Sequence, residues 1–304
     1  MLDAASHANP QRFTVALDDG ELAGWRWAND NAPALLFCHA TGFCASVYKQ
    51  MLQHLSSEFD IYALDMRGHG KTSLPADPEG LRSWGVYAGD VIAFLDAQPE
   101  KKWVLAGHSL GAITIALAAK ARSDVSALAL IEPVVIPAPV AAMAKTPLWR
   151  LMGRRSPMAR RAAKRRSQWA GRADVLKSYA GKAIFARWAD GVLGDYLEDG
   201  LESSAAGKGV TLACHPEWEA ATFAALDTDF ASAVRQHTVS MSIFAGRLDD
   251  TTIDKSARRR CVNWSIPVTE SSRLSHLAPM EGPKECADFI RHAAQISLIS
   301  RKPD

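Results

Sequence analysis

The hydrophobic and polar positions repeat with two different periods along the chain, and the change of period predicts the secondary structure. Residues 12–17 and 21–27 alternate, and between them stands Asp18-Asp19-Gly20, a turn sequence typical of a β-hairpin. Residues 34–38 and 61–64 are short apolar runs, as in parallel strands buried on both faces, and 46–55 has helical spacing. The pattern predicts an antiparallel start followed by β-α-β units.

The β-α alternation continues on both sides of a central stretch. Further strands are predicted at 103–106, 126–131, 239–245 and 266–269, and further helices at 81–97, 110–121, 252–262 and 283–296. Residues 137–236 are rich in Ala, Arg and Trp and predict several helices without strands. We therefore predict a mostly parallel, eight-stranded α/β sheet flanked by helices. Its core spans 1–136 and 237–304, and a helical cap (lid) is inserted over 137–236, after the sixth strand.

Composition narrows the function classes. The 304 residues are 48% apolar and carry a net charge of +2, too small an excess to favour nucleic acid as a partner. The five cysteines contain no C-x-x-C pair, which predicts neither a disulfide framework nor a thiolate zinc site and fits a cytoplasmic location. The first residues lack the features of a secretory signal, so we expect none. Prolines interrupt the longest apolar stretch, so we expect no transmembrane segment. The oligomeric state is left open.

A candidate nucleophile lies in Gly107-His108-Ser109-Leu110-Gly111. This sequence directly follows a predicted strand and precedes a predicted helix, as in a nucleophile elbow. The glycines leave room for the tight turn that exposes Ser109. The amide of Leu110, at the positive end of the helix, can donate to an oxyanion. The alternative is that Ser109 only caps the helix.

A second oxyanion donor is expected in the loop after the predicted strand at 34–38. The sequence there, residues 39–43, is rich in small residues, and we expect the Thr41 amide to be that donor. The alternative is that this loop is only a tight turn. The substrate pocket is predicted to be lined by Ala40, Gly42, Phe43, His108 and Glu132. No phosphate-binding loop and no metal-ligand spacing is present, so no metal and no cofactor are expected.

Five sequence motifs carry a resemblance to a known family. They are HATGF at 39–43, DMRGHG at 65–70, GHSLG at 107–111, GRLD at 246–249 and SHLAPME at 275–281. In this order they resemble the alpha/beta-hydrolase superfamily, in its serine esterase or lipase-like branch with a helical cap. The resemblance spans nearly the full chain except the cap, and it departs at Ala40, where the family's HGxG motif has glycine.

The base and the acid follow from this resemblance. A serine hydroxyl needs an adjacent base, and histidine has the pKa for that near neutrality. The family places its base where His276 stands, ahead of the last helix. Asp249 matches the family's usual acid, which would hold the imidazole. Glu132 is the alternative acid, because some members place it after the preceding strand; Asp250 and Asp254 fit a turn or a helix start better.

The expected chemistry is acyl transfer through a Ser-His-Asp triad and an acyl-enzyme intermediate. The default is a carboxylesterase acting on a small-molecule ester with a small or medium acyl group. Amide, lactone or carbon-carbon bond hydrolysis by the same triad and a non-catalytic ligand receptor are alternatives. Epoxide hydrolases and haloalkane dehalogenases of this family use an aspartate at the elbow and are disfavoured.

Residues 150–166 hold a local excess of positive charge, with eight basic residues and no acid. The favoured interpretation is a solvated helix face over packed apolar residues. The alternatives are attraction of an anionic substrate, an acidic surface or lipid headgroups. The bases are Arg150, Arg154, Arg155, Arg160, Arg161, Lys164, Arg165 and Arg166.

Overall fold

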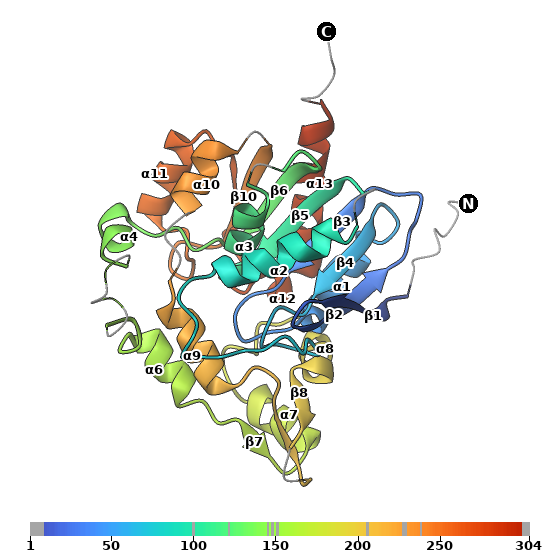
Figure 1. Ribbon diagram of the computed structural model, residues 1–304, viewed down its shortest axis with the longest axis vertical. Coiled ribbons are helices and arrows are strands. Elements are labelled where there is room, and N and C mark those ends of the chain that lie inside the picture. Colours follow the sequence, from blue (N-terminus) through green and yellow to red (C-terminus); the bar gives the residue numbers. More distant parts are fainter. Residues whose placement is uncertain are drawn as a thin grey trace.

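Eight strands form one sheet in the order β1-β2-β4-β3-β5-β6-β10-β11 (Figure 1). This is seen in a computed structural model that describes residues 9–299, apart from 99–100, 121, 145, 147–148, 150–151, 205–206, 227–229 and 238. The strands are β1 (Gln11–Leu17), β2 (Gly20–Trp27), β3 (Ala34–Cys38), β4 (Asp60–Leu64), β5 (Trp103–His108), β6 (Val125–Ile131), β10 (Ser240–Ala245) and β11 (Val268–Glu270). Strands β1, β2 and β4 pair antiparallel and the others parallel, which confirms the predicted sheet.

Helices cover both faces of this sheet (Figure 1). Neighbouring residues Leu35 and Leu36 in β3 are both fully buried but belong to two different apolar clusters, because successive side chains of a strand point to opposite faces. On one face pack α2 (Gly85–Asp96), α3 (Leu110–Ala118) and α11 (Lys255–Asn263). On the other pack the 3-10 helix η1 (Ala45–Tyr48), α1 (Lys49–Gln53), α12 (Ala278–Glu281) and α13 (Pro283–Ile299). Burial on both faces explains why these strands are continuous apolar runs.

The residues between β6 and β10 form a separate group of elements, called the insertion below. Its helices are α4 (Ala138–Ala144), α6 (Pro157–Ala163), α7 (Arg172–Ala180), α8 (Val192–Asp199), α9 (Pro216–Ala224) and α10 (Phe230–Gln236). Most of them gather below the sheet in Figure 1. The division into core and cap domains stays a prediction.

The expectation that the insertion lacks strands was wrong. A small antiparallel sheet, in the order β7-β9-β8, joins β7 (Gln168–Trp169), β8 (Leu201–Ser203) and β9 (Val210–Leu212). These strands are two or three residues long. A strand this short cannot display the alternation by which strands are recognised in a sequence. No helix among the described residues is both long and apolar enough to cross a lipid bilayer.

Candidate active site

Ser109 occupies a sharp turn between β5 and α3. Its backbone is in an unusual conformation, with φ 54° and ψ −112°, and its amide donates to the carbonyl of Ile131 at 2.9 Å. A Cβ atom built on Gly107 would lie 2.6 Å from the carbonyl carbon of Gly111, and one on Gly111 would lie 2.1 Å from the carbonyl oxygen of Cys38. Both glycines are therefore required by close backbone packing, and the strand, turn and helix of an elbow are present.

Glu132 is the buried centre of a hydrogen-bond cluster at the end of β6. Its side chain is fully buried. It accepts hydrogen bonds from the amides of Gly246 (2.5 Å) and Thr252 (2.8 Å) and from the hydroxyls of Thr251 (2.5 Å) and Thr252 (2.9 Å). Its Oε2 also lies 3.0 Å from Nδ1 of His276. These contacts compensate the burial of a carboxylate.

The same contacts keep Glu132 ionised. Burial by itself would raise the pKa of this carboxyl group, but the hydrogen bond and charge of His276, together with the Gly246 and Thr251 donors, outweigh burial and lower the pKa to about 2. A carboxylate accepts hydrogen bonds only, so Nδ1 of His276 carries a proton. With that proton on Nδ1, Nε2 is the ring nitrogen left to accept a proton from a neighbouring group.

Asp249, the acid expected from the sequence, does not take this place. Its side chain is 77% exposed and pairs with Nε of Arg247 at 3.0 Å. The chain turns back after β10, so that Thr251 and Thr252 reach Glu132 while Asp249 faces solvent. The structure thus corrects the expected geometry in favour of the alternative, Glu132. Asp250 also pairs with Arg247, and Asp254 caps α11 through the Ala257 amide.

Two residues with left-handed backbone stand at neighbouring strand ends. Ser109 follows β5 and Glu132 follows β6, and these strands pair side by side. Among the described residues, the non-glycine residues with positive φ are Ser109, Glu132 (φ 49°) and Ser265. Backbone strain of this kind clusters at functional sites. It supports a joint role for the two side chains.

His108 connects the elbow to the His276 loop. Its Nε2 donates to the carbonyl oxygen of His276 at 2.8 Å, and the two imidazole rings lie 5.1 Å apart. Nδ1 of His108 lies 2.8 Å from the Tyr48 hydroxyl, which in turn accepts from the Ala40 amide at 3.0 Å. Burial and the neighbouring His276 lower the pKa of His108 to about 3, so the ring is neutral. Its single ring proton is on Nε2, and Nδ1 accepts a hydrogen bond from the Tyr48 hydroxyl.

The expected pocket role of His108 is therefore corrected. The residue is fully buried and both of its ring nitrogens are engaged, so it is an internal connector. Sequence reasoning missed Tyr48, whose hydroxyl links the loop at 39–43 to this connector. Nothing in the local pattern around Tyr48 signals that role, because the partners stand far away in the sequence.

The amides of the loop at 39–43 have different partners. Ala40 donates to Tyr48, Gly42 to Nε2 of His69 at 3.1 Å, and Phe43 to the Ala40 carbonyl at 3.2 Å. Among the residues that the structure describes, none accepts a hydrogen bond from the amide of Thr41 or from that of Leu110, the first residue of α3. Those two N–H groups are free to meet a ligand. An N–H group without a described acceptor at both positions is what the two expected oxyanion donors need, and their role stays a prediction.

The side chains of His69 and His39 link the loop at 39–43 to the motif at 65–70 by hydrogen bonds. Burial lowers the pKa of His69 to about 4, so its neutral ring can accept from Gly42 while Nδ1 donates to the Arg67 carbonyl at 3.0 Å. Nε2 of His39 accepts from the Met66 amide at 2.9 Å. The motif at 65–70 thus supports the loop at 39–43.

Arg165 of the insertion reaches the same loop. Its guanidinium donates to Glu219 at 2.9 Å and to the hydroxyls of Tyr179 and Tyr196, both at 3.1 Å. A Cβ atom on Gly42, whose φ is +78°, would lie 3.3 Å from Nη1 of Arg165. The sequence groups Arg165 with a basic run, but the structure turns it inward, away from the other bases.

Aromatic rings of the insertion also contact the loop at 39–43. The ring of Phe43 lies 5.8 Å from that of Trp188 and 5.7 Å from that of Tyr196. Of the residues expected to line the pocket, Gly42 and Phe43 thus face the insertion, whereas Ala40 is buried in the core. His276 keeps 27% of its side chain exposed.

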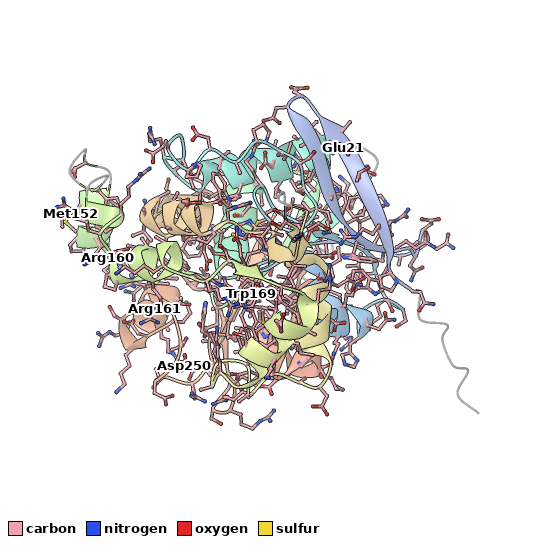
Figure 2. The ribbon with its side chains drawn as sticks, turned by 90° about the horizontal axis from the view of Figure 1, so that it is seen from below. Glu21, Met152, Arg160, Arg161, Trp169 and Asp250 are labelled. Atoms are coloured by element: carbon pink, nitrogen blue, oxygen red, sulfur yellow. The ribbon has the colours of Figure 1, made fainter. Side chains whose placement is uncertain are left out.

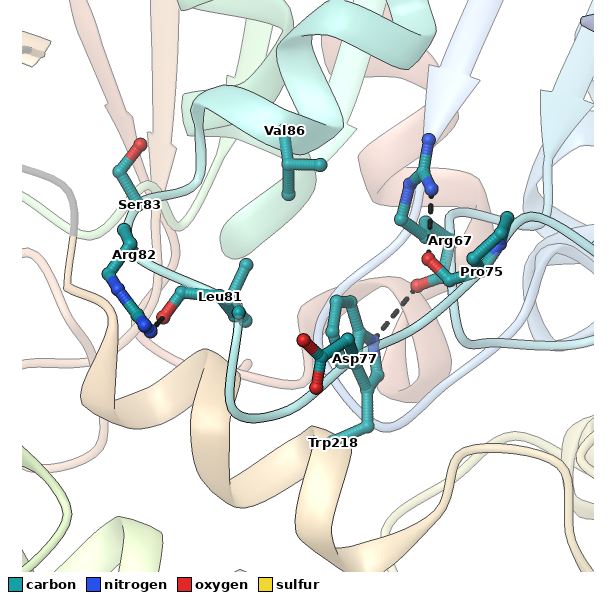
Figure 3. A pocket seen from close by; sticks show the side chains of 9 residues that line it. Arg67, Pro75, Asp77, Leu81, Arg82, Ser83, Val86 and Trp218 are labelled. Carbon is teal, nitrogen blue, oxygen red and sulfur yellow. Dashed lines mark hydrogen bonds between the residues drawn. The ribbon is translucent and has the colours of Figure 1, made fainter. Parts of the chain in front are cut away.

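Two hollows on the surface lie apart from this site. One, of about 300 Å³, is lined by Arg67, Leu81, Trp218 and neighbouring residues of the loop at 75–83 (Figure 3). There Trp218 donates from its indole nitrogen to the carbonyl of Arg67 at 3.0 Å. The other, of about 460 Å³, lies between that loop and α9. Neither is lined by Ser109 or His276.

Within the described residues no cluster of three or more His, Cys, Asp or Glu side chains could hold a metal ion.

The fold is of the α/β class. Ser109 lies at an elbow after β5, the buried carboxylate of Glu132 follows the neighbouring β6, and His276 contacts that carboxylate. A model of the alpha/beta hydrolase family matches residues 35–289, and the chain belongs to this family.

Individual relatives match shorter parts. An epoxide hydrolase from Caballeronia sordidicola is 41% identical over 95 residues, which are 30% of this chain and 28% of that protein. A 2-(acetamidomethylene)succinate hydrolase from Mesorhizobium japonicum is 32% identical over 121 residues, 40% of this chain and 42% of that protein. The chain thus spans less than half the length of these curated relatives. A crystal structure of E-2-(acetamidomethylene)succinate hydrolase superposes with a TM-score of 0.76 at 19% identity, covering 94% of this chain and all of the other, which shows the shared fold.

Proposed function

We propose that the protein is a serine hydrolase that cleaves carboxylic esters through an acyl-enzyme intermediate. The observation that carries this proposal is the hydrogen bond between buried Glu132 and His276. The loop that holds His276 is in turn bonded to His108, the residue before Ser109. An ionised acid, an imidazole and a serine at an elbow are the three parts that nucleophilic acyl transfer requires.

In the proposed mechanism, Nε2 of His276 removes the proton of the Ser109 hydroxyl as its oxygen attacks the ester carbonyl carbon. The tetrahedral oxyanion accepts hydrogen bonds from the amides of Leu110 and Thr41. His276 returns the proton to the leaving alcohol as the carbon-oxygen bond breaks. Water, deprotonated by the same nitrogen, then releases the acid and restores Ser109. Glu132 stabilises the imidazolium throughout and itself stays ionised.

In this proposal the insertion acts as a cap. It supplies Trp188 and Tyr196, whose rings surround Phe43 beside the oxyanion loop. Such apolar walls favour ester substrates with an apolar acyl or alcohol part.

The test measures hydrolysis of p-nitrophenyl acetate and butyrate by the wild type and by Ser109→Ala. We expect kcat/KM to fall about a thousandfold or more in the variant, while its melting temperature stays close to that of the wild type. A fluorophosphonate should label the wild type at the peptide that carries Ser109. Turnover in the variant, label on another serine, or no turnover by the wild type on either ester would refute the proposal.

A second candidate, hydrolysis of an amide or ester that bears a free carboxylate, is favoured by the position of Arg165. Three of the five guanidinium N–H groups bond to described side chains, so two remain for a ligand beside Gly42. The substrate name of the Mesorhizobium relative contains succinate, a dicarboxylate. We propose to compare neutral esters with their carboxylated analogues in the wild type and in Arg165→Gln. A preference for the carboxylated analogue that disappears in the variant supports this candidate, and equal use of both analogues rules it out.

A further inference from the structure

The basic residues of the insertion are exposed and lack acidic partners in most cases. Arg165 turns inward to Glu219, and Arg154 pairs with Glu79 at 2.7 Å. Arg155, Arg160, Arg161 and Lys164 are exposed, and no acidic side chain among the described residues pairs with any of them. We call these four residues the basic face. Removing the eight positive charges of 150–166 from the net +2 of the chain leaves −6 on the rest, so the positive charge is concentrated here.

The orientation of α6 explains this exposure. Ala159 and Ala162, three residues apart, are buried, because α6 packs on α9. Arg160, Arg161 and Lys164 point away from those two alanines and therefore face solvent. Figure 2 shows Arg160 and Arg161 at the outer side of the insertion, with Met152 beyond them.

Exposed apolar side chains accompany the basic face. Met158 is 60% exposed and Met152 is 42% exposed. Within the described residues, five of the eight exposed large apolar side chains belong to the insertion, although it is a third of the chain. A flexible methionine beside arginines can enter the boundary between lipid headgroups and acyl chains while the guanidinium groups stay with the headgroups.

From these observations we propose that the basic face, with Met152 and Met158, docks the protein on a membrane surface rich in anionic lipid. Charge complementarity selects this partner, since a polybasic surface is attracted to anionic headgroups. The exposed methionines favour a bilayer over a nucleic acid, which offers them no apolar partner. This inference does not depend on the proposed function, because the basic face does not include the residues of the proposed active site.

The experiment measures sedimentation of the full chain with vesicles of phosphatidylcholine alone and of phosphatidylcholine with phosphatidylglycerol in equal parts. We expect binding to the anionic vesicles only, and its loss at high salt. Replacing Arg155, Arg160, Arg161 and Lys164 together by Gln should lower the partition coefficient by about a hundredfold or more. Replacing Met152 and Met158 by Gln should lower it by about tenfold while the dependence on salt persists.

The matched control replaces four exposed basic residues outside the basic face by Gln: Lys102, Lys208, Lys255 and Arg259. It changes the net charge by the same amount and should retain vesicle binding within about twofold. Melting curves verify that each variant is folded. Equal binding to neutral vesicles, equal losses in both quadruple variants, or retention on RNA without vesicle binding would overturn the proposal.

Discussion

The Nδ1 atom of His276 lies 3.0 Å from a carboxylate oxygen of Glu132, at the end of β6. Asp249, one strand further along the sheet, is exposed and pairs with Arg247. The carboxylate that contacts the imidazole of His276 in this structure therefore follows the sixth strand of the chain.

We predict that Glu132→Gln lowers kcat for ester hydrolysis by about a hundredfold to ten-thousandfold, because an amide cannot stabilise the imidazolium. Asp249→Asn is the matched control: it also removes one carboxylate at a strand end and should keep kcat within about twofold. Steady-state kinetics on p-nitrophenyl butyrate measure both. Loss of activity in Asp249→Asn with retention in Glu132→Gln would reverse the assignment.

The hydrogen bonds of Tyr48 lead to a second prediction. Tyr48→Phe removes both the acceptor of the Ala40 amide and the donor to His108, and we expect kcat to fall by about tenfold with a stability loss of about 1–3 kcal/mol. On the proposed mechanism KM should change less than kcat, because the hydroxyl supports the loop at 39–43 and, through His108, the loop of His276.

Tyr87→Phe is its control. Tyr87 is equally buried and its hydroxyl bonds to Thr222 at 2.7 Å, away from the site. It should cost similar stability with unchanged kcat, as measured by urea unfolding and by kinetics. Equal kinetic effects in both variants would show that Tyr48 has only a structural role.

The low pKa of Glu132 predicts an acid-dependent loss of stability. Its folded value of about 2 lies below the ordinary 4.5, so the unfolded chain binds this proton more readily. The stability that Glu132 contributes is fully present above pH 4.5 and is lost as the pH falls through its folded pKa of about 2. Urea unfolding across this window should show a steeper loss for the wild type than for Glu132→Gln. Identical slopes would contradict the lowered pKa.

Two helical glycines should respond in opposite ways to substitution by alanine. Gly111→Ala places a methyl group 2.1 Å from the Cys38 carbonyl oxygen, and we expect a loss of about 3 kcal/mol or more. A Cβ atom built on Gly89 in α2 would meet no described atom within 4 Å, so Gly89→Ala should stabilise by up to about 1 kcal/mol. Thermal melting of both variants measures this contrast. A stable Gly111→Ala protein would show that α3 can move away from β3.

The sequence predicted the sheet well because its strands are buried on both faces and read as apolar runs. It also placed Ser109 correctly at a turn between strand and helix, since the glycines around it are required locally. These features depend on neighbours in the chain, which periodicity and motifs can detect.

The choice between Asp249 and Glu132 could not be made in this way. It depends on how the chain folds back after β10, where Thr251 and Thr252 donate to Glu132 across more than a hundred residues. The positions of Tyr48 and Arg165 likewise depend on distant partners. Contacts of this range leave no period in the sequence.

The positive φ of Ser109 means that thermal stability and the proposed catalysis favour different residues at this position. Glycine adopts this backbone conformation without the steric cost that serine bears there. A library selected only for survival of heating should therefore accumulate glycine at 109, and the same library selected for catalysis should restore serine.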